Sequence, residues 1–480
     1  MLLTKTSAFF AAFLLTATAA FGQETWSLER CILHARDNNI TIKQAQASVR
    51  TALLSERQAK ASRLPSLSAS FDAGEQFGRT IDPTTNTFSP NATGYNSLGL
   101  RAGAQVFAGG QIHHAVKQAA WDLRASEADA EQTMNALALQ IAQSYLSILL
   151  TEEQLKSAQR RISQSGEQLK VTQKLIEAGT LPLADKYTIE AQIARDEQAA
   201  VTVQNSLDLA YLNLKQFLQL EPDFDLRIER PAVTVPADAR PDELTLSPLY
   251  ALATTTQPSI RAAGFRMKSA AEGIDIAKSA YFPTVSVFAN LSSNYSTQFP
   301  DFKRATFLGT ELGDVEVYRI AGQDVPVQRY NSSFDIPTLG YFDQIDRNFG
   351  QGVGVSINIP IYQNGRNRLS VERARLALLN SEMQNTQTQQ QLKNDIQTAI
   401  ANARAGRKQL DAAQKSFTAM QTAFQNMEKR HAIGAVNSFD LTTARNNLNT
   451  AENDLIVAKY DYLFRLKILD FYQGKPLDLK

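Results

Sequence analysis

The strongest constraint on this chain is a pair of apolar stripes between Ile396 and Tyr462. Along each stripe the apolar residues recur at alternating spacings of three and four, interrupted once by Gly406. The first arm carries Ile396, Ala399, Ala403, Leu410, Ala413, Phe417, Met420, Phe424 and Met427, and the second carries Leu441, Ala444, Leu448, Ala451, Leu455, Ala458 and Tyr462. This spacing is typical of the seam of a coiled coil. Because Gly434 separates the arms, the pattern predicts two long helices that turn back on each other with facing seams.

A second copy of this hairpin lies 255 positions earlier in the chain. The matched pairs are Gly179 with Gly434, Asp185 with Asp440, and Phe107 with Tyr362. The arm after Gly179 repeats the stripe with Ile189, Ile193, Ala200, Val203, Leu207, Ala210 and Leu214. The sequence therefore predicts a duplicated helical hairpin, with long helices at about 111–178, 182–220, 365–431 and 437–472. The first of these would extend roughly 100 Å, which no compact core requires.

The hydrophobic period changes from 3.6 to 2 after Pro65 and again after Pro283, where apolar and polar residues alternate. This alternation predicts strands at about 66–76, 96–107, 284–295 and 350–361, two in each half. Before the first strand, Trp26 to Ser62 contains no proline and is predicted to form one helix. The offset between the halves grows from 218 to 255 across the second pair of strands, so residues 301–346 are predicted to form a long exposed loop. A proline-rich link, residues 221–248, joins the halves.

Composition narrows the class of protein. The 480 residues exceed one ordinary core, and the duplication favours a single elongated object over several domains. Lys and Arg total 49 against 48 for Asp and Glu, so the net charge of +1 gives no field that favours nucleic acid or an acidic substrate. The one cysteine, Cys31, cannot form an internal disulfide and has no neighbouring metal-ligand pattern. It is predicted to be a small buried residue.

The first 22 residues are predicted to be a secretory signal peptide. Lys5 supplies a positive start, residues 8–21 are almost wholly apolar, and small residues precede a cleavage site before Gln23. Beyond this segment no apolar run reaches the length of a transmembrane helix. If the mature protein spans a membrane, it is therefore expected to do so with strands.

The alternating strands suit an outer-membrane barrel, in which one face meets lipid and the other lines a wet interior. Each predicted strand has roughly the 9 to 11 residues that cross a bilayer. Four strands are too few to close a barrel, since the smallest have about 8, so copies of the chain would have to associate. A soluble sheet with one solvated face is the alternative. The signal peptide and the rod-like helices favour the barrel, because the helices already bury their stripes in one another.

Several short motifs recur in the same order in both halves. They are Trp26-Ser27-Leu28-Glu29 through Asn38-Asn39, Leu64-Pro65-Ser66-Leu67, Phe282-Pro283-Thr284-Val285, Glu177-Ala178-Gly179-Thr180, Ala432-Ile433-Gly434, and Asp440-Leu441 through Ala444-Arg445, followed by Leu448, Ala451 and Tyr460 to Leu463. Together they resemble the outer membrane efflux protein family, the exit ducts of tripartite efflux pumps and type I secretion systems. The resemblance covers nearly all of the mature chain, and its specificity lies in the order of the motifs.

The resemblance implies a mainly α fold with a β-barrel part. Three identical chains would form a 12-stranded outer-membrane β-barrel, four strands from each, continuous with an α-helical barrel across the periplasm. Residues 23–246 and 247–480 would be the two repeats. The implied function is passive conduction to the exterior of a Gram-negative cell, with a periplasmic adaptor protein and an inner-membrane transporter of the RND or ABC type as partners. The transported substrate is not implied.

Family members narrow the tunnel at its inner end, where the helical hairpins turn, and acidic residues line this constriction. Matching motif to motif places Asp440 and Asp185 there, with Gly434 and Gly179 as the turns of the hairpin tips. Three copies of one carboxylate around an axis would attract cations and repel anions. The alternative is that each acid only occupies the first turn of a helix, where the helix dipole favours it.

This chain departs from the family pattern at the gate. Where some relatives carry a second acidic residue it has Thr443, and where they carry an aromatic residue and an arginine it has His431 and Val436. His431 could titrate near neutral pH at the tip, and the alternative is an exposed histidine without a role. The sequence therefore does not say which residues hold the channel in its closed state.

Two other classes of protein are the alternatives. An enzyme is disfavoured because the four histidines, His34, His113, His114 and His431, form no zinc motif, and no GxSxG or P-loop occurs. The pair His113 and His114 is predicted to be a solvated turn, and no catalytic residue, cofactor or metal is expected. A periplasmic coiled-coil adaptor or structural protein would explain the heptads but would not require the alternating strands.

Overall fold

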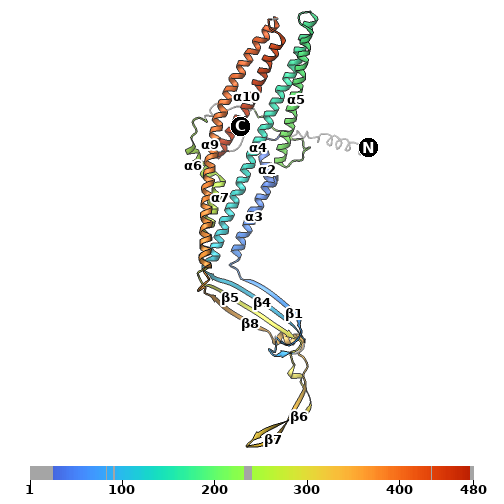
Figure 1. Cartoon of the computed structure of the whole chain (residues 1–480), viewed down its shortest axis with the longest axis vertical. Coiled ribbons are helices and arrows are strands. Elements are labelled where there is room, and N and C mark those ends of the chain that lie inside the picture. Colours follow the sequence, from blue (N-terminus) through green and yellow to red (C-terminus); the bar gives the residue numbers. More distant parts are fainter. Residues whose placement is uncertain (1–24, 83, 90–91, 232–240, 434, 476–480) are drawn as a thin grey trace, which may run out of the picture. The chain divides into compact units, whose positions relative to one another are not determined.

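The computed structural model describes residues 25–82, 84–89, 92–231, 241–433 and 435–475 (Figure 1). The predicted signal peptide, residues 1–22, lies outside the described residues. By its internal contacts the chain divides into a unit made of residues 1–54, 119–270 and 377–480, and a unit made of residues 55–118 and 271–376. The first is helical, and the second contains the main β-sheet and the ends of four helices.

The helices repeat with the two offsets expected from the sequence. Two pairs start 218 positions apart: α2 (Leu28–Asn38) with α6 (Leu246–Thr256), and α3 (Ile40–Ala61) with α7 (Pro258–Ser279). Two further pairs start 255 positions apart: α4 (Gln111–Glu177) with α9 (Arg366–Ala432), and α5 (Leu183–Leu218) with α10 (Ser438–Tyr472). The duplicated helical hairpin is therefore present in the structure.

None of the described helices combines the length and the apolar character needed to cross a membrane.

The helical unit has two apolar cores, and Tyr460 of α10 contributes to the first of them. In the first, α2, α4 and α5 bury a cluster that includes Cys31, Tyr145, Ile148 and Leu214. In the second, α6, α9 and α10 bury a cluster around Ile396. As predicted, Cys31 is fully buried, and this burial raises the pKa of its thiol to about 12.

Gly406, which interrupts the apolar stripe of α9, is explained by its contact with α10. A β-carbon at this position would lie 3.0 Å from Cδ of Arg465 and 3.3 Å from Cδ2 of Tyr462. The absence of a side chain therefore lets the two helices approach closely. The guanidinium of Arg465 uses this proximity to donate to the carbonyl oxygen of Asn402 at 2.7 Å.

The prediction of one helix from Trp26 to Ser62 is wrong, because the chain breaks at Asn39. This residue has an extended backbone, with φ −65° and ψ 132°. Its side-chain oxygen accepts from the backbone N–H of Thr41 at 2.8 Å, as an N-cap does, and its amide donates to the carbonyl of Phe217 at 2.8 Å. The break thus depends on a contact with α5. The periodicity of a single helix gives no sign of such a contact between helices. In the second half the break falls at Gln257, since a following proline, Pro258, disfavours the helical conformation before it.

The four strands of the main sheet lie in the order β1-β4-β5-β8, all antiparallel. They span Ser66–Gln76 (β1), Thr93–Ala108 (β4), Thr284–Ser296 (β5) and Gly350–Asn358 (β8). The last strand, β8, ends at Asn358 and not at residue 361 as predicted, because Pro360 has no N–H with which to continue the ladder. Both edge strands, β1 and β8, have one side without a partner strand in the described chain.

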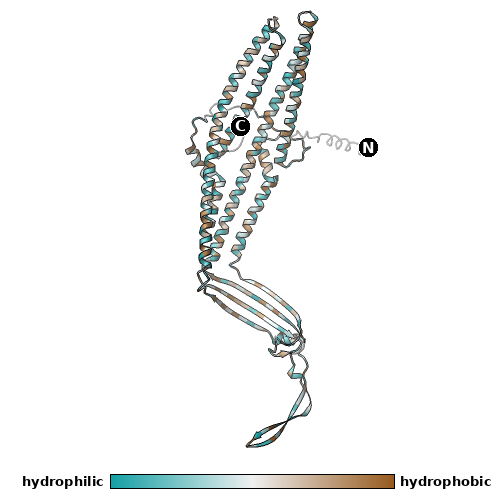
Figure 2. Cartoon of the chain, in the orientation of Figure 1, coloured by the Kyte–Doolittle hydropathy of each residue, from teal (hydrophilic) through white to brown (hydrophobic). Residues whose placement is uncertain are grey.

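The register puts the apolar residues of all four strands on one face of the sheet. Across the sheet, Leu100 pairs with Ala69 on one side and with Leu291 on the other. Two neighbouring rows lie on the same face. One consists of Leu67, Ala102, Ala289 and Val353, and the other of Ala104, Val287 and Val355. Figure 2 shows the alternation of hydrophobic and hydrophilic residues along the strands. On the apolar face Leu67 is 75% exposed, Val353 87% and Ile357 62%. This face is therefore uncovered within the single chain.

The opposite face is lined by small and polar residues. On this face the ring of Tyr95 lies beside Gly74, and Phe288 lies over Gly354, where a β-carbon would come within 2.5 Å of the Phe288 ring. Glycine at this position is therefore required by the close approach of Phe288. The rest of the face carries residues such as Ser68, Arg101 and Asn290.

The predicted long exposed loop, residues 301–346, contains regular structure. A separate two-stranded sheet, β6 (Thr306–Ile320) with β7 (Gln323–Asp335), occupies most of this segment, and α8 (Tyr341–Arg347) follows it. The strands are joined by Ala321 and Gly322, both with positive φ, as a two-residue hairpin turn requires. A second short pair, β2 (Thr80–Ile81) with β3 (Phe88–Ser89), lies in the connection between β1 and β4.

The link after α5 is held against the helices by a buried carboxylate. Glu152 of α4 is 6% exposed and accepts hydrogen bonds from Nε and Nη2 of Arg230, at 2.6 and 2.9 Å, and from the hydroxyl of Tyr211 at 2.9 Å. The hydroxyl of Tyr145 donates to the carbonyl of Glu229 at 2.6 Å. These bonds make the link a fixed part of the first core. Residues 232–240 of the link lie outside the described residues.

Candidate functional site

The first hairpin tip, between α4 and α5, is closed by a glycine in the left-handed conformation. Gly179 has φ +74°, and no atom lies within 4 Å of the position of a β-carbon, so backbone geometry rather than space selects glycine. The N–H of Thr180 donates to the carbonyl of Leu175 at 2.9 Å, which completes a helix-terminating Schellman turn. Pro182 then stands at the N-cap of α5.

The second tip, between α9 and α10, repeats this turn. The N–H of Ala435 donates to the carbonyl of Arg430 at 2.9 Å, the equivalent of the bond between Thr180 and Leu175 255 positions earlier. Asn437 caps α10 by accepting from the backbone N–H of Asp440 at 2.8 Å. Gly434, the predicted turn residue, lies outside the described residues.

The two tips enclose one cleft of about 900 Å³ within the helical unit. Asp185, Asp440 and His431 all line it, together with Arg430, a cation that sequence reasoning did not single out. The carboxylates come from the first turns of α5 and α10, where the positive end of the helix dipole stabilises negative charge. The structure therefore brings three of the four predicted gate residues to one place.

Thr443, the fourth, does not line this cleft. It is exposed on α10, and its hydroxyl donates to the carbonyl of Phe439 at 2.9 Å. His431 is half-buried, with Nε2 3.3 Å from the hydroxyl oxygen of Ser438. The imidazole therefore joins the end of α9 to the start of α10.

A polar cluster that the sequence did not reveal joins the first hairpin to the second. We call it the α4–α10 cluster; it consists of Gln154, Ser157 and Arg160 on α4 and Glu452 and Asn453 on α10. The carboxylate of Glu452 accepts from the Ser157 hydroxyl and from Nη2 of Arg160, each at 2.8 Å, and Gln154 donates to Asn453 at 2.8 Å. Ser157 is 2% exposed, so these bonds form in a closely packed contact. The residues lie about 300 positions apart, and no local pattern could have paired them.

The prediction that His113 and His114 form a solvated turn is wrong for His114. Its Nδ1 lies 2.6 Å from a carboxylate oxygen of Glu272 on α7, and Asp275 lies close by. These three residues have ligand types suited to a metal ion. Each carboxylate, however, also has a lysine partner: Lys117 is 3.9 Å from Glu272, and Lys278 is 2.9 Å from Asp275. The arrangement is that of an ion-pair cluster between two helices.

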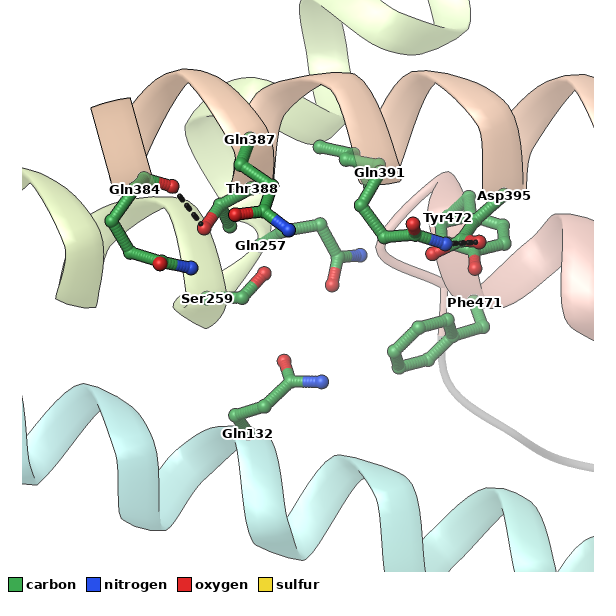
Figure 3. Close-up of a pocket in the computed structure, with 11 residues that line it drawn as sticks. Gln132, Gln257, Ser259, Gln384, Gln387, Thr388, Gln391, Asp395, Phe471 and Tyr472 are labelled. Carbon is green, nitrogen blue, oxygen red and sulfur yellow. Dashed lines mark hydrogen bonds between the residues drawn. The ribbon is translucent and has the colours of Figure 1, made fainter. Parts of the chain in front are cut away.

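A smaller cleft of about 340 Å³ is lined by glutamine side chains (Figure 3). Gln132 of α4, Gln257 before α7, and Gln384 and Gln391 of α9 surround it. Gln391 donates to Asp395 at 2.7 Å, whereas the buried Oε1 of Gln132 has no hydrogen-bond partner. The side chains that line this cleft offer hydrogen bonds but no pairing of a nucleophile with a base.

Comparison with known proteins identifies the fold. The sequence pattern described as outer membrane efflux protein matches residues 32–218 and 249–474, which is most of the chain. The chain belongs to the outer membrane efflux protein family. The predicted family, the fold class of duplicated helical hairpins with a β part, and the outer-membrane location are thereby confirmed.

Named members of this efflux family match along almost the whole chain. The outer membrane efflux protein BepC of Brucella suis biovar 1 (strain 1330) is 21% identical over 462 residues, covering 94% of this chain and 88% of BepC. The outer membrane protein TolC of Escherichia coli (strain K12) is 22% identical over 435 residues, covering 89% of this chain and 78% of TolC. The crystal structure of the outer membrane protein VceC of Vibrio cholerae superposes with a TM-score of 0.72 at 18% identity, covering 94% of this chain and 97% of VceC. The structural match shows that this efflux protein shares its fold with VceC.

Proposed function

We propose that three copies of this efflux protein form the outer-membrane exit channel of a tripartite efflux or type I secretion system. The observation that carries the proposal is the sheet β1-β4-β5-β8, whose apolar residues share one exposed face and whose two edges are open. In lipid, an open sheet edge leaves backbone groups without hydrogen-bond partners, so a spanning sheet has to close. Joining β8 of each copy to β1 of the next closes a ring of twelve strands.

The polar face of the sheet supports a water-filled interior. Ser68, Arg101 and Asn290 would line the lumen, while Leu67, Val353 and Ile357 would face lipid. Such a channel conducts passively and needs no catalytic residue or cofactor. The cleft between the hairpin tips is the surface that we assign to the periplasmic adaptor protein and to an inner-membrane transporter of the RND or ABC type.

The test is purification and bilayer recording of the full chain. We expect extraction from the outer membrane only with detergent, a native mass of three chains, and ohmic conductance after insertion into a planar lipid bilayer. A monomer released with the periplasmic fraction, or trimers that conduct no ions, would contradict the proposal. The first outcome would favour a periplasmic adaptor.

Asp440→Ala should weaken cation preference. In a trimer, three Asp440 carboxylates would form a ring at the tips, and each attracts a passing cation by roughly 1 kcal/mol at contact distance in water. Removing them is expected to lower the ratio of cation to anion permeability about twofold to fivefold, measured from reversal potentials in asymmetric salt. Asp454→Ala is the matched control, since Asp454 is exposed on the same helix but does not line the cleft. Equal ratios in wild type and Asp440→Ala would remove the gate role of this residue.

Glu452→Ala should favour the open channel. Opening at the tips would require the second hairpin to separate from the first, and Glu452 holds them together through Ser157 and Arg160. Because Arg160 is 58% exposed, we expect the loss of only about 1 kcal/mol per copy, equivalent to about a fivefold shift toward the open state for each copy. Single-channel recording measures this shift as open probability, with Asp454→Ala again as the control. An open probability like that of wild type would show that the α4–α10 cluster does not restrain the tips.

A further inference from the structure

The hairpin of β6 and β7, residues 306–335, forms a sheet of its own and is called the ribbon below. A two-stranded hairpin is at best marginally stable in water, because it cannot bury an apolar face by itself. Most of the ribbon's large apolar side chains are indeed more than half exposed, among them Leu312 at 61% and Tyr330 at 73%. The ribbon therefore requires a surface to pack against.

Cross-strand pairing puts six large apolar side chains on one face of the ribbon, while the opposite face has paired apolar residues only near the turn, namely Tyr318, Ile320, Val325 and Val327. Phe307 pairs with Phe334, Leu312 with Tyr330, and Val315 and Val317 continue the same face toward the turn. The rings of Phe307 and Phe334 meet edge to face, with centroids 5.5 Å apart. The six side chains Phe307, Leu312, Val315, Val317, Tyr330 and Phe334 are between 52% and 73% exposed.

The charges of the ribbon lie mainly on the other face. Glu311 and Glu316 point there, and Arg329 lies on the same side, with Nη2 3.7 Å from Glu316. The apolar face carries one charged pair near the turn, Arg319 and Asp324, with Nε and Oδ1 3.4 Å apart. In all, the ribbon has five acidic and two basic residues, so it is poorly suited to an anionic membrane surface.

The topology places the ribbon beside the boundary between copies. It lies in the connection from β5 to β8, and β8 is an edge strand of the sheet. At the same end of the sheet, the other edge strand, β1, leads into the connection to β4, since Gln76 pairs with Thr93 and Tyr95 with Ser296. When β8 of one copy meets β1 of the next, the ribbon of the first and the β1–β4 connection of the second become neighbours.

The β1–β4 connection offers a complementary surface. Phe77 is 77% exposed, Ile81 50% and Phe88 65%, and we call these three residues the loop patch. The guanidinium of Arg79 lies 4.9 Å from the ring centre of Phe88 and gives the patch a positive charge. The exposed apolar side chains of this patch are complementary to the exposed apolar side chains on that face of the ribbon.

We infer that the apolar face of each ribbon packs on the loop patch of the neighbouring copy, a contact that we call the strap. The three straps would hold the three subunits together at one end of the sheet, opposite the end where the chain continues into α4 and α9. The inference rests on the proposed trimer. It gives a partner surface to the exposed apolar residues of a hairpin that pairs with no other strand in the described part of the chain.

Cysteine crosslinking tests the contact and its direction. We would combine Phe334→Cys with Phe88→Cys in the full chain carrying Cys31→Ala, and oxidise the purified protein in detergent. A contact between copies gives covalent dimers and trimers on non-reducing SDS gels. The matched control combines Ser333→Cys with Phe88→Cys, because Ser333 lies one residue away on the opposite face of the ribbon. We expect the control to crosslink at least tenfold more slowly.

Native mass spectrometry of the same samples distinguishes failure of the ribbon contact from failure of the proposed trimer. Particles of three chains that yield only monomers on the gel, or crosslinks within one chain, would overturn the strap and leave the channel proposal standing. A monomeric mass would overturn both. As a second measurement, Leu312→Ser with Val317→Ser should lower the temperature at which the trimer dissociates, whereas Tyr318→Ser with Ile320→Ser, on the opposite face, should not. Equal dissociation temperatures in the two double variants would also overturn the strap.

Discussion

Replacement of Leu214 by alanine is expected to lower the free energy of unfolding by about 3 to 4 kcal/mol. Leu214 on α5 has no exposed surface and belongs to the core that α2, α4 and α5 share. Truncation removes three buried carbon atoms and leaves a cavity, because long helices tied together on several sides cannot collapse to fill it. In far-UV circular dichroism of the protein in detergent, the helical signal should be lost about 3 to 4 °C earlier than in wild type.

Leu214→Met is the matched control for this cavity. Methionine nearly conserves the volume of leucine, so this substitution should cost less than about 1.5 kcal/mol. All three proteins should be heated at one scan rate, since membrane proteins often unfold irreversibly and the midpoint then depends on the rate. Equal losses in Leu214→Ala and Leu214→Met would mean that the site tolerates no change at all, and the cavity explanation would be wrong.

Glu152→Gln is expected to cost about 2 kcal/mol at neutral pH, because it weakens hydrogen bonds to a buried charged group. Burial by itself would raise the pKa of the Glu152 carboxyl, but the hydrogen bonds from Arg230 and Tyr211 and the charge of Arg230 outweigh burial and lower the pKa. The folded protein therefore holds the ionised form more strongly than the unfolded chain does. The resulting stability is complete above the ordinary glutamate pKa of about 4.3 and is lost as the pH falls through the lower pKa of the folded state.

The pH dependence distinguishes this explanation from simple loss of packing. The difference in thermal midpoint between wild type and Glu152→Gln should be constant from pH 7 to about pH 5 and should shrink below about pH 4. Arg230→Gln removes the other partner and should show the same trend, while Lys170→Gln, which removes an exposed charge elsewhere on α4, should not. A difference that stays the same down to pH 3 would mean that the ionised carboxylate does not hold the link.

Sequence reasoning worked best where the signal is local and repeated. The seam that contains Ile396, Ala399 and Ala403 is buried in the second core, and the offset of 255 between Gln111 and Arg366 appears in the structure without change. The alternation around Leu67 and Val353 likewise falls on one face of the sheet. A helix repeats every 3.6 residues and a strand every two, so a few neighbouring residues are enough to reveal each element and its apolar side.

The candidate site was predicted in part, and through family resemblance. Asp185, Asp440 and His431 line the cleft between the tips, but their role in a gate stays a prediction. The α4–α10 cluster was missed because Ser157 and Glu452 are ordinary helix-surface residues in sequence. The ribbon was also missed, although the alternating valines on both sides of Ala321 and Gly322 were a usable signal for a hairpin.

The sequence by itself determined the four long helices, the four strands of the main sheet, their duplication and their apolar faces, since these follow from local periodicities. Only the tertiary structure decided which distant side chains meet. Asn39 breaks its helix to reach Phe217, Glu152 binds Arg230, and Glu452 joins two hairpins. Such contacts depend on where the folded backbone brings two surfaces together, and a hydrogen bond between residues hundreds of positions apart leaves no periodic pattern in either segment.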